Sequence, residues 1–446
     1  MGTLETGVVV LGAGFAGLAC AEQLAQAGVD FVVLEARDRV GGRAWTDATT
    51  IPGFRAELGA MMIHGRNVVT QQYVSRFGLR TEPLLRLRAI HLALDQRVSA
   101  FPWMALPFHP VVGPRRLHAA LVRVPRELAR AEGPDRSLEN YLSLRAAPAA
   151  TRALVELNHA HIFAMDPDAI GVLGPAEETR AAPTPWDYRN YRIVQGYSEL
   201  ASRLAASVQS HLRLRTMVGS VRWNSGEFGV RVEAVSEGAS WSVKADQAVV
   251  TFPLGVLQSD SVVFEPTLPE EKRRAIGELV MADAFTMHVR VHGGTLRRTL
   301  GVPSFLWGRT PSSFFLARPS GSSEDVVVSA FTVGREARRR VAMADSELVD
   351  ATLHELQEIL PLGTQLGSPG PATVHRWSSD PLARGAYSCI PVDGRLRARQ
   401  ELARPLEPGL YFAGEATHCH GAASTVHGAI ETGRRAAQEL MESRTA

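Results

Sequence analysis

The chain has 446 residues, of which 45% are hydrophobic and 21% charged, and its formal net charge is +2. These values are typical of a soluble globular protein of two or three domains, and the small net charge predicts no nucleic acid or other polyanionic partner. The three cysteines (Cys20, Cys389 and Cys419) form no disulfide framework and favour a reducing compartment, so we expect a cytoplasmic protein. The N-terminus has no basic segment, and we expect neither a signal peptide nor a membrane span.

Residues 7–43 are predicted to form a strand, a glycine turn, a helix and a second strand. The turn reads Gly12-Ala13-Gly14-Phe15-Ala16-Gly17. Gly12 allows the tight turn, Gly14 lets a pyrophosphate approach the backbone, and Gly17 lets the helix pack closely on the strand. Glu35 ends the second strand, where its carboxylate can accept the hydroxyls of an adenosine ribose. The stretch therefore predicts a dinucleotide site and disfavours a 2′-phosphate.

Two further motifs contain small residues. The first ends in Gly41-Gly42-Arg43, where Arg43 can neutralise a phosphate. The second reads ELGAMMIHG over residues 57–65, and its small residues allow a planar ligand against the backbone. LEARDRVGGR followed by ELGAMMIHG resembles the flavin-containing amine oxidase family, as a bacterial member. That family includes monoamine and polyamine oxidases, flavin-dependent histone demethylases and nicotine-alkaloid oxidases, and the IHG ending is most similar to the polyamine oxidases.

Periodicity predicts the remaining elements. Strands are expected over 212–221, 230–235, 241–243, 248–250, 285–291 and 326–332. Helices are expected within 115–145 and over 158–165, after Pro269, over 346–359 and from Thr425. Loops are expected at 320–324 and 363–371.

The resemblance implies an α/β fold with a Rossmann-like FAD-binding domain of the glutathione-reductase type. A substrate domain of mixed sheet and helices would complete the p-hydroxybenzoate-hydroxylase/amine-oxidase architecture. The FAD-binding domain is expected to be discontinuous, from residues 1–79, 201–275 and 380–446. The substrate-binding domain would then comprise residues 80–200 and 276–379.

FAD is the implied cofactor. Some family members attach it covalently to a cysteine just before an aromatic residue of the site; that position here is Ala386, so we expect non-covalent binding. By the same resemblance, Val218 contacts adenine through its backbone. The expected FAD-binding residues are Gly12, Gly14, Phe15, Ala16, Gly17, Glu35, Ala36, Arg37, Gly42, Arg43, Gly59, Ala60, Met61, Val218, Pro253, Trp377, Gly414, Glu415, Thr425 and Val426.

Three positions are expected to decide the chemistry. Tyr387 matches the family's aromatic residue that faces the flavin, whereas the partner aromatic, expected near 421–423, is absent. His64 could hydrogen-bond the substrate or accept a proton, although a structural histidine is an equal alternative. Thr286 occupies the position of a lysine that holds a water near flavin N5 in most members. This departure puts fast reaction with oxygen in doubt.

Neither group of neighbouring histidines predicts a metal site. His159 and His161 are two residues apart on a helix and so lie on different faces. The side chains of residues 418–420 are adjacent in the chain and cannot converge easily on one ion. We therefore expect no metal.

We expect a FAD-dependent oxidoreductase that oxidises a C–N bond of an amine, a polyamine or a specialised-metabolite amine. A hydride would pass to flavin N5, the amine would become an imine, and O2 would reoxidise the flavin and yield H2O2. One alternative is a desaturase or isomerase acting on C–C bonds of a secondary metabolite, which the missing lysine and aromatic favour. Another is a non-catalytic flavoprotein or demethylase module. The sequence gives no indication of oligomeric state.

Overall fold

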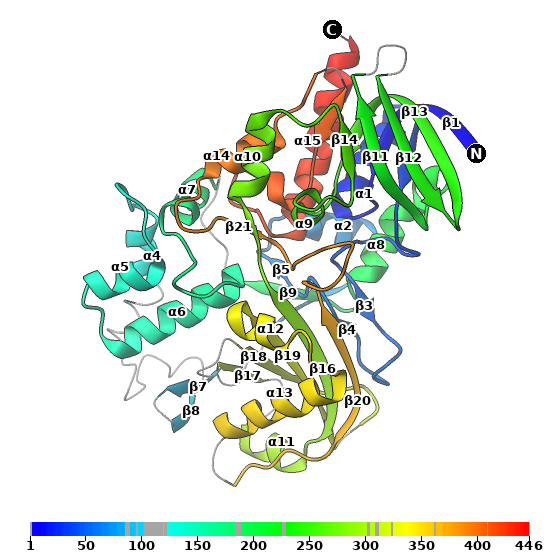
Figure 1. Ribbon diagram of the computed structural model, residues 1–446. Coiled ribbons are helices and arrows are strands. Elements are labelled where there is room, and N and C mark those ends of the chain that lie inside the picture. The colour runs from blue at the N-terminus through cyan, green and yellow to red at the C-terminus, as the bar shows by residue number, and fades with distance from the viewer. Residues whose placement is uncertain are drawn as a thin grey trace.

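The computed structural model contains two large sheets, one above the other in the view of Figure 1, and the chain passes between them several times. Its described residues are 2–84, 90–94, 97–101, 119, 123–182, 189–224, 229–300, 304–307, 312–322, 324–360, 363–407 and 409–445. Most of the predicted helical stretch before residue 123 therefore lies outside the described residues. No helix within the described ranges is both long and apolar enough to cross a bilayer.

The first sheet is built around β1 (Gly2–Leu11), whose second half is fully buried. β1 is parallel to β2 (Phe31–Leu34) on one side and to β13 (Ala239–Val250) on the other. Central parallel strands are covered on both faces, which explains why their sequences are continuous apolar runs. The strand order is β10 (Leu212–Arg213), β2, β1, β13, β12 (Val230–Ser236), β11 (Thr216–Trp223) and β14 (Val263–Glu265), and β22 (Leu410–Phe412) also pairs with β13.

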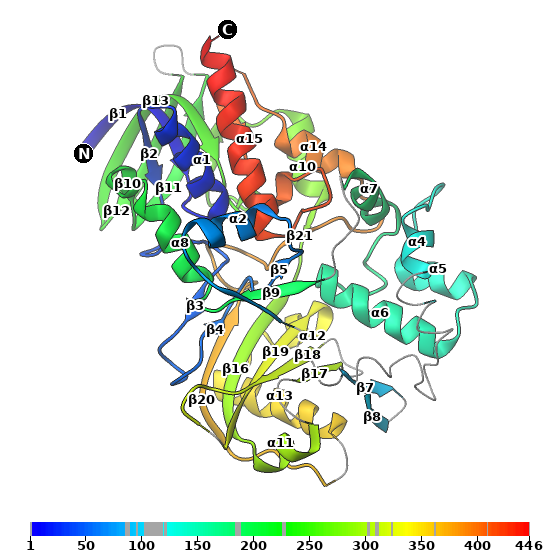
Figure 2. The ribbon, with the colours of Figure 1, turned by 180° about the vertical axis from the view of Figure 1, so that it is seen from behind.

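Helices α1 (Phe15–Gln26) and α15 (Val426–Thr445) cover one face of this sheet, with α8 (Tyr197–Ala206) and α2 (Val69–Arg76) beside them (Figure 2). The first two cross closely, because a Cβ at Gly433 would lie 2.1 Å from the carbonyl oxygen of Ala16. This contact fixes the N-terminal ends of both helices near the carboxyl edge of the parallel strands, where α/β folds bind their ligands.

The second sheet is antiparallel except where β17 meets β7. Its order is β20 (Pro369–Arg376), β16 (Ala284–His292), β19 (Asp325–Val333), β18 (Ser312–Ala317), β17 (Ser304–Trp307), β7 (Ile90–Leu94) and β8 (Arg97–Phe101). Helices α11 (Gly294–Leu300), α12 (Gly334–Arg340) and α13 (Asp345–Ile359) belong to this half of the molecule. Residues such as Phe285 and Met287 join the core with α13, so alternate residues such as Thr286 point to the opposite face.

Short elements connect and flank the two sheets. The helices are α4 (Val124–Leu128), α5 (Leu138–Leu144), α6 (Ala149–Phe163), α7 (Leu173–Ala181), α9 (Leu254–Leu257), α10 (Glu270–Glu278) and α14 (Leu396–Ala403), and two 3₁₀ turns cover Gln209–His211 and Glu415–Thr417. The strands are β3 (Thr46–Asp47), β4 (Ala56–Glu57), β5 (Ile63–His64), β6 (Thr81–Pro83), β9 (Asn190–Ile193), β15 (Val280–Met281) and β21 (Ser388–Cys389).

The predicted α/β fold class is confirmed, and several element boundaries are corrected. The strand predicted over 212–221 is two strands, because Arg215 has a φ of +52° and the chain changes partners there, from β2 to β12. The strands predicted over 241–243 and 248–250 are one continuous strand, β13. The loop predicted to end at residue 371 stops earlier, because β20 begins at Pro369. The domain boundaries stay a prediction.

Candidate active site

A single cavity of about 1650 Å³ collects nearly all the predicted site residues. Its walls include His64, Thr286, Tyr387 and every predicted FAD-binding residue except Gly17. Pockets for one small ligand measure roughly 300–1,000 Å³, so this cavity has room for a large cofactor and a second molecule. Residues of both sheets and of helices α6 and α7 contribute to it.

The glycine turn forms an open cradle at one end of the cavity. A Cβ on Gly14 would meet no protein atom within 4 Å, although this residue lines the cavity wall. Gly14 is also the N-cap of α1 and offers no side-chain cap, so the N–H groups of the first helical turn are available to an anion. Gly17 is different, because its Cβ would lie 1.9 Å from the carbonyl oxygen of Gly12. These features fit a pyrophosphate at Gly14 and close helix–strand packing at Gly17.

Glu35 lies next to this cradle at the end of β2. Its carboxylate accepts hydrogen bonds from the backbone N–H groups of Ala13 (2.7 Å) and Arg37 (2.8 Å). Burial raises the pKa of Glu35, while these two hydrogen bonds oppose that rise. Each carboxylate oxygen has a second lone pair, so the group is held in place and can still accept ribose hydroxyls.

The guanidinium of Arg37 is anchored by an acid far along the chain. Its Nη2 lies 2.9 Å from both carboxylate oxygens of Asp380. His375 Nε2 lies 3.2 Å from the same carboxylate. Burial alone would raise the pKa of Asp380, but the neighbouring side chains of His375 and Arg37 hold it well below its usual range. Asp380 therefore orients Arg37 along the cavity wall.

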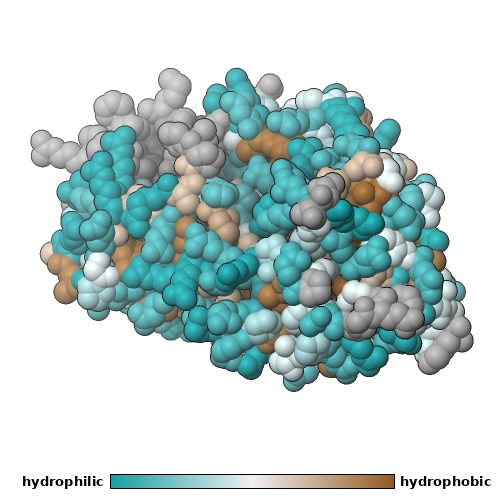
Figure 3. Space-filling model, turned by 90° about the horizontal axis from the view of Figure 1, so that it is seen from above, coloured by the Kyte–Doolittle hydropathy of each residue, from teal (hydrophilic) through white to brown (hydrophobic). Residues whose placement is uncertain are grey.

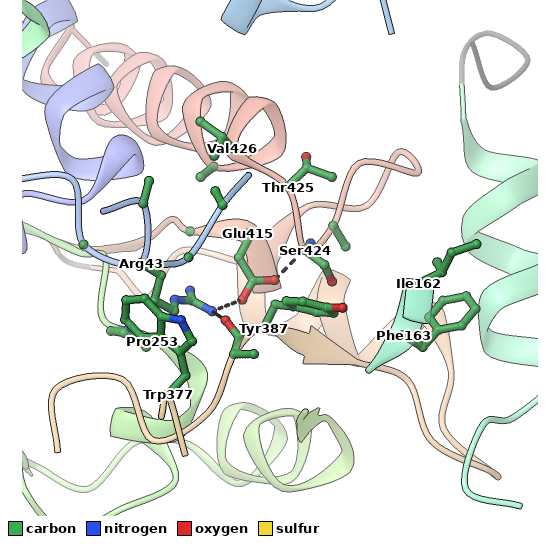
Figure 4. Close-up of a pocket in the computed structure, with 18 of the residues that line it drawn as sticks. Arg43, Ile162, Phe163, Pro253, Trp377, Tyr387, Glu415, Ser424, Thr425 and Val426 are labelled. Atoms are coloured by element: carbon green, nitrogen blue, oxygen red, sulfur yellow. Dashed lines mark hydrogen bonds and ion pairs between the residues drawn. The ribbon is translucent and has the colours of Figure 1, made fainter. Parts of the chain in front are cut away.

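A buried charge network forms part of the cavity wall (Figure 4). Glu415 is 2.8 Å from Arg43 Nη1, and it accepts hydrogen bonds from Ser388 Oγ (2.6 Å) and from the backbone N–H of Ser424 (3.0 Å). Arg399, only 1% exposed, donates to Ser388 Oγ at 2.6 Å. Burial would raise the pKa of Glu415, but the charges of Arg43 and Arg399 hold it below its usual value. Arg43 thus reaches the cavity with its charge already balanced by Glu415.

Trp377 closes the cavity beside the second motif. Its indole Nε1 donates to the carbonyl oxygen of Leu58 at 2.7 Å. A Cβ on Gly59 would lie 1.8 Å from the carbonyl oxygen of Arg43 and 2.9 Å from the Trp377 ring. Gly59 is therefore required by protein packing as well as by any ligand against its backbone.

Tyr387 lies beside Glu415 and projects toward Ile162 and Phe163 at the end of helix α6 (Figure 4). Its hydroxyl donates to the carbonyl oxygen of His161 (3.2 Å), and Cys389 Sγ donates to that of Phe163 (2.9 Å). Burial raises the pKa of Tyr387 well above its ordinary value, so the hydroxyl stays neutral. These bonds fix the end of α6, and with it Ile162 and Phe163, against the cavity. Sequence reasoning did not predict that Phe163 lines the cavity beside Tyr387, because only the fold brings the end of α6 next to β21.

The segment where a second aromatic was expected packs on helix α7 instead. A Cβ on Gly421 would lie 2.6 Å from the Cβ of Ala182 and 3.0 Å from the carbonyl oxygen of Glu178. His418 fixes the start of this segment, since its Nδ1 accepts from the N–H groups of His420 and Ala422, and its Nε2 lies 2.8 Å from Glu431. No cluster of three or more potential metal ligands occurs in the part of the chain that the structure describes.

His64 lies on β5 beside Asn190 on β9, and both line the cavity. Its Nδ1 is 2.9 Å from the carboxamide oxygen of Asn190. That oxygen only accepts, so Nδ1 carries the proton and Nε2 is left with a free lone pair. Burial lowers the pKa of His64, which favours this neutral form. The histidine is thus held as an acceptor. Asn190 was not predicted, because its partner lies 126 residues away.

Thr286 lies on the cavity face of β16, between Phe331 on β19 and His375 on β20. Both lysines of the chain lie elsewhere. Lys244 pairs with Glu5 at 3.2 Å, and Lys272 is buried against the carbonyl oxygens of Glu401 (2.7 Å) and Leu402 (3.1 Å). Neither lines the cavity, so no lysine replaces the one expected at Thr286.

The chain is similar in sequence to several known proteins. Polyamine oxidase 3 of Oryza sativa subsp. japonica is 30% identical over 465 residues, which cover 97% of this chain and 88% of the relative. Polyamine oxidase 2 of Arabidopsis thaliana is 29% identical over 462 residues, covering 98% and 89%. A lysine-specific histone demethylase 1 homolog 2 of Oryza sativa subsp. japonica is 29% identical over 469 residues, covering 99% of this chain and 57% of the relative.

Solved structures share the fold. Wild-type putrescine oxidase bound to putrescine superposes with a TM-score of 0.83 at 20% identity, covering 99% of this chain and 100% of that one. Cyclohexylamine oxidase from Brevibacterium oxydans IH-35A gives 0.81 at 19% identity with the same coverage. The family model for flavin containing amine oxidoreductases matches residues 15–441. FAD is its cofactor, and the chain belongs to the flavin-containing amine oxidoreductase family.

Proposed function

We propose that this protein oxidises the C–N bond of a small-molecule amine to an imine, with non-covalently bound FAD. The observation that carries the proposal is the continuity of the cavity: the glycine cradle, Glu35, Tyr387 and His64 all line it. The similarity to polyamine oxidases supports an amine as substrate. When bound, the flavin supplies the acceptor for the hydride that leaves the α-carbon of the amine.

The residues of the chain position the amine and keep it reactive. His64 Nε2, with its free lone pair, accepts a hydrogen bond from the amine nitrogen, which orients the amine, or takes its proton, which leaves the amine neutral. The Tyr387 ring and Phe163 exclude water from one side of the site. Ala386 precedes Tyr387 and its methyl group cannot form a thioether, which supports non-covalent binding.

O2 is the proposed electron acceptor, with H2O2 as product. Thr286 places a buried hydroxyl where a lysine was expected, and no lysine side chain reaches this part of the described cavity. We therefore expect reoxidation to be slower than reduction by a good amine substrate.

Anaerobic mixing with a panel of polyamines, amino acids and alkaloid-like amines tests the proposed function. At least one amine is expected to bleach the yellow flavin absorption, and admitting air should restore it with stoichiometric H2O2. If no amine bleaches the flavin, the desaturase or isomerase alternative replaces this proposal. If bleaching occurs and air does not restore the colour, amine oxidation stands and O2 is the wrong acceptor.

Replacing His64 with glutamine is expected to slow flavin reduction by about 100-fold, at the low end of general base effects. The flavin should stay bound, because the observed side-chain hydrogen bond of His64 goes to Asn190, which is not one of the predicted FAD-binding residues. His159 offers a matched control, since it is also a neutral, buried histidine of the cavity wall but bonds within its own helix to the carbonyl of Val155 at 2.8 Å. Stopped-flow reduction should show a much smaller loss for His159→Gln. Complete loss of flavin reduction in His64→Gln, with the flavin still bound, would contradict this prediction, because it would show that the reaction cannot proceed without His64.

A further inference from the structure

One face of the second sheet forms an aromatic wall of the cavity beyond Thr286. Strand pairing places Phe305 opposite Phe315 and Phe315 opposite Ser329, while Phe331 lies opposite Thr286. All of these residues line the cavity. The wall is therefore a set of phenylalanine rings around the Ser329 hydroxyl, a surface that suits the apolar body of a substrate.

The hydroxyl of Ser329 has a fixed polarity. Its Oγ lies 2.7 Å from His288 Nδ1, and His288 Nε2 lies 2.9 Å from the carbonyl oxygen of Glu57. A carbonyl oxygen can only accept, so Nε2 carries the imidazole proton and Nδ1 must accept. Burial lowers the pKa of His288 to about 4, so a second ring proton is absent at neutral pH. Ser329 therefore donates its only hydrogen to His288.

This arrangement leaves the lone pairs of Ser329 to a partner in the cavity. A serine hydroxyl otherwise rotates to donate or to accept, whereas Ser329, whose hydrogen is already donated to His288, can only accept from a group in the cavity. Ser329 is two residues along β19 from Phe331, which is about 7 Å at the usual rise per residue. The Ser329 hydroxyl thus lies about the length of one aromatic ring from the strand position of Thr286. The family resemblance places the reacting amine end of the substrate near Thr286.

The surroundings favour an uncharged donor over an ammonium group. Burying an ammonium needs a paired charge, and phenylalanine rings and the hydroxyls of Ser313 and Ser329 do not provide it. Among the described residues, Asp47 is close enough to affect His288, but it bonds to Thr49 and Thr50 and does not line the cavity. The carboxyl of Glu57 also lies near Ser329, but it accepts hydrogen bonds from the backbone N–H of Tyr197 (3.0 Å) and from Thr46 Oγ1 (2.8 Å). Burial also raises its pKa to about 8, so it is largely protonated at neutral pH.

We propose that Ser329 accepts a hydrogen bond from an uncharged O–H or N–H donor at the far end of an arylalkylamine substrate. This inference rests on the amine oxidation proposed above and assigns its substrate class: an amine with a flat apolar body and a terminal neutral donor. Ser329 would be a specificity-determining residue that touches substrate, and His288 a positioning residue that fixes its polarity.

The test compares 4-hydroxyphenethylamine with phenethylamine, which differ only in the terminal hydroxyl. Anaerobic rapid mixing over a range of amine concentrations gives the Kd and the limiting reduction rate separately. One hydrogen bond predicts a Kd about three- to tenfold lower for the hydroxylated amine in the wild type. In Ser329→Ala the two Kd values should converge, with similar limiting rates for both amines. Ser312→Ala is the matched control, because this buried serine is on the opposite face of the sheet and bonds to Thr332 Oγ1 at 2.9 Å.

Equal Kd values in the wild type would overturn the inference without any variant. A preference that survives in Ser329→Ala would overturn the role of Ser329, and tighter binding of putrescine than of either aromatic amine would overturn the substrate class. The same Kd values can be read from the change in the flavin absorption spectrum on binding, which needs no reaction. Failure of every amine to reduce the flavin therefore counts against the proposed function, while the binding comparison still decides the role of Ser329.

Discussion

Gly14→Ala is expected to give a folded protein that binds FAD more weakly. The added methyl group would meet no protein atom within 4 Å, so the fold tolerates it, but it would project into the cradle at the N-terminus of α1. A methyl group forced into a filled site costs about 1–3 kcal/mol, which corresponds to about a 5- to 150-fold weaker Kd. Titrating apoprotein with FAD and following flavin fluorescence measures this loss, and circular dichroism checks the fold.

Gly17→Ala is the matched control for this prediction. The same methyl group at Gly17 would lie 1.9 Å from the carbonyl oxygen of Gly12, so it should separate α1 from β1 and lower the stability of the apoprotein itself. Two alanine substitutions three residues apart should therefore give opposite results. Normal FAD affinity in Gly14→Ala would show that the cofactor does not lie against this turn.

Glu415→Gln is expected to have the largest effect on stability. Glu415 is 6% exposed and faces both Arg43 and Arg399, so its neutralisation leaves the largely buried Arg43 without its carboxylate partner, whereas Arg399 keeps Glu178. Removing one partner of a buried ion pair costs about 3–5 kcal/mol. Urea denaturation of the apoprotein at pH 7 measures the change. Glu431→Gln is the control, because Glu431 pairs with His418 from a side chain that is 44% exposed and should cost about 1 kcal/mol or less.

The same carboxylate predicts the sign of a pH dependence. The folded-state pKa of Glu415 is below its unfolded value of about 4.5, so the unfolded state binds more protons as the pH falls. The stabilisation is complete above the unfolded pKa and is lost as the pH falls through the folded pKa. The stability difference between wild type and Glu415→Gln should therefore shrink on acidification below about pH 4.5. A difference that is constant down to low pH would contradict this assignment.

The cofactor half of the molecule could be predicted from the sequence because it depends on local signals. An apolar strand, the glycines of the turn and Glu35 lie within a short stretch, and each is required by backbone geometry or burial there. The same reasoning missed the break at Arg215, where a positive φ in a non-glycine residue sends the chain to a new partner strand.

The substrate half depends on pairs that are distant in the sequence. The polarity of His64 is set by Asn190, and that of Ser329 by His288, and these partners are 126 and 41 residues apart. The aromatic wall arises from alternate residues on neighbouring strands, whose register cannot be derived from one strand alone. The sequence shows that no aromatic residue stands near Gly421, but the end of α6 that contributes Phe163 became visible only in the fold.

The reaction proposed for this cavity is the oxidation of a neutral amine at its α-carbon. Its most direct test is the anaerobic rate of flavin reduction by an active amine with hydrogen or deuterium on that carbon. Breaking the α-C–H bond predicts a rate several-fold lower for the deuterated amine, and a rate that rises with pH as the free amine loses its proton. Bleaching at the same rate with both isotopes and at every pH, or no bleaching by any amine, would contradict the account.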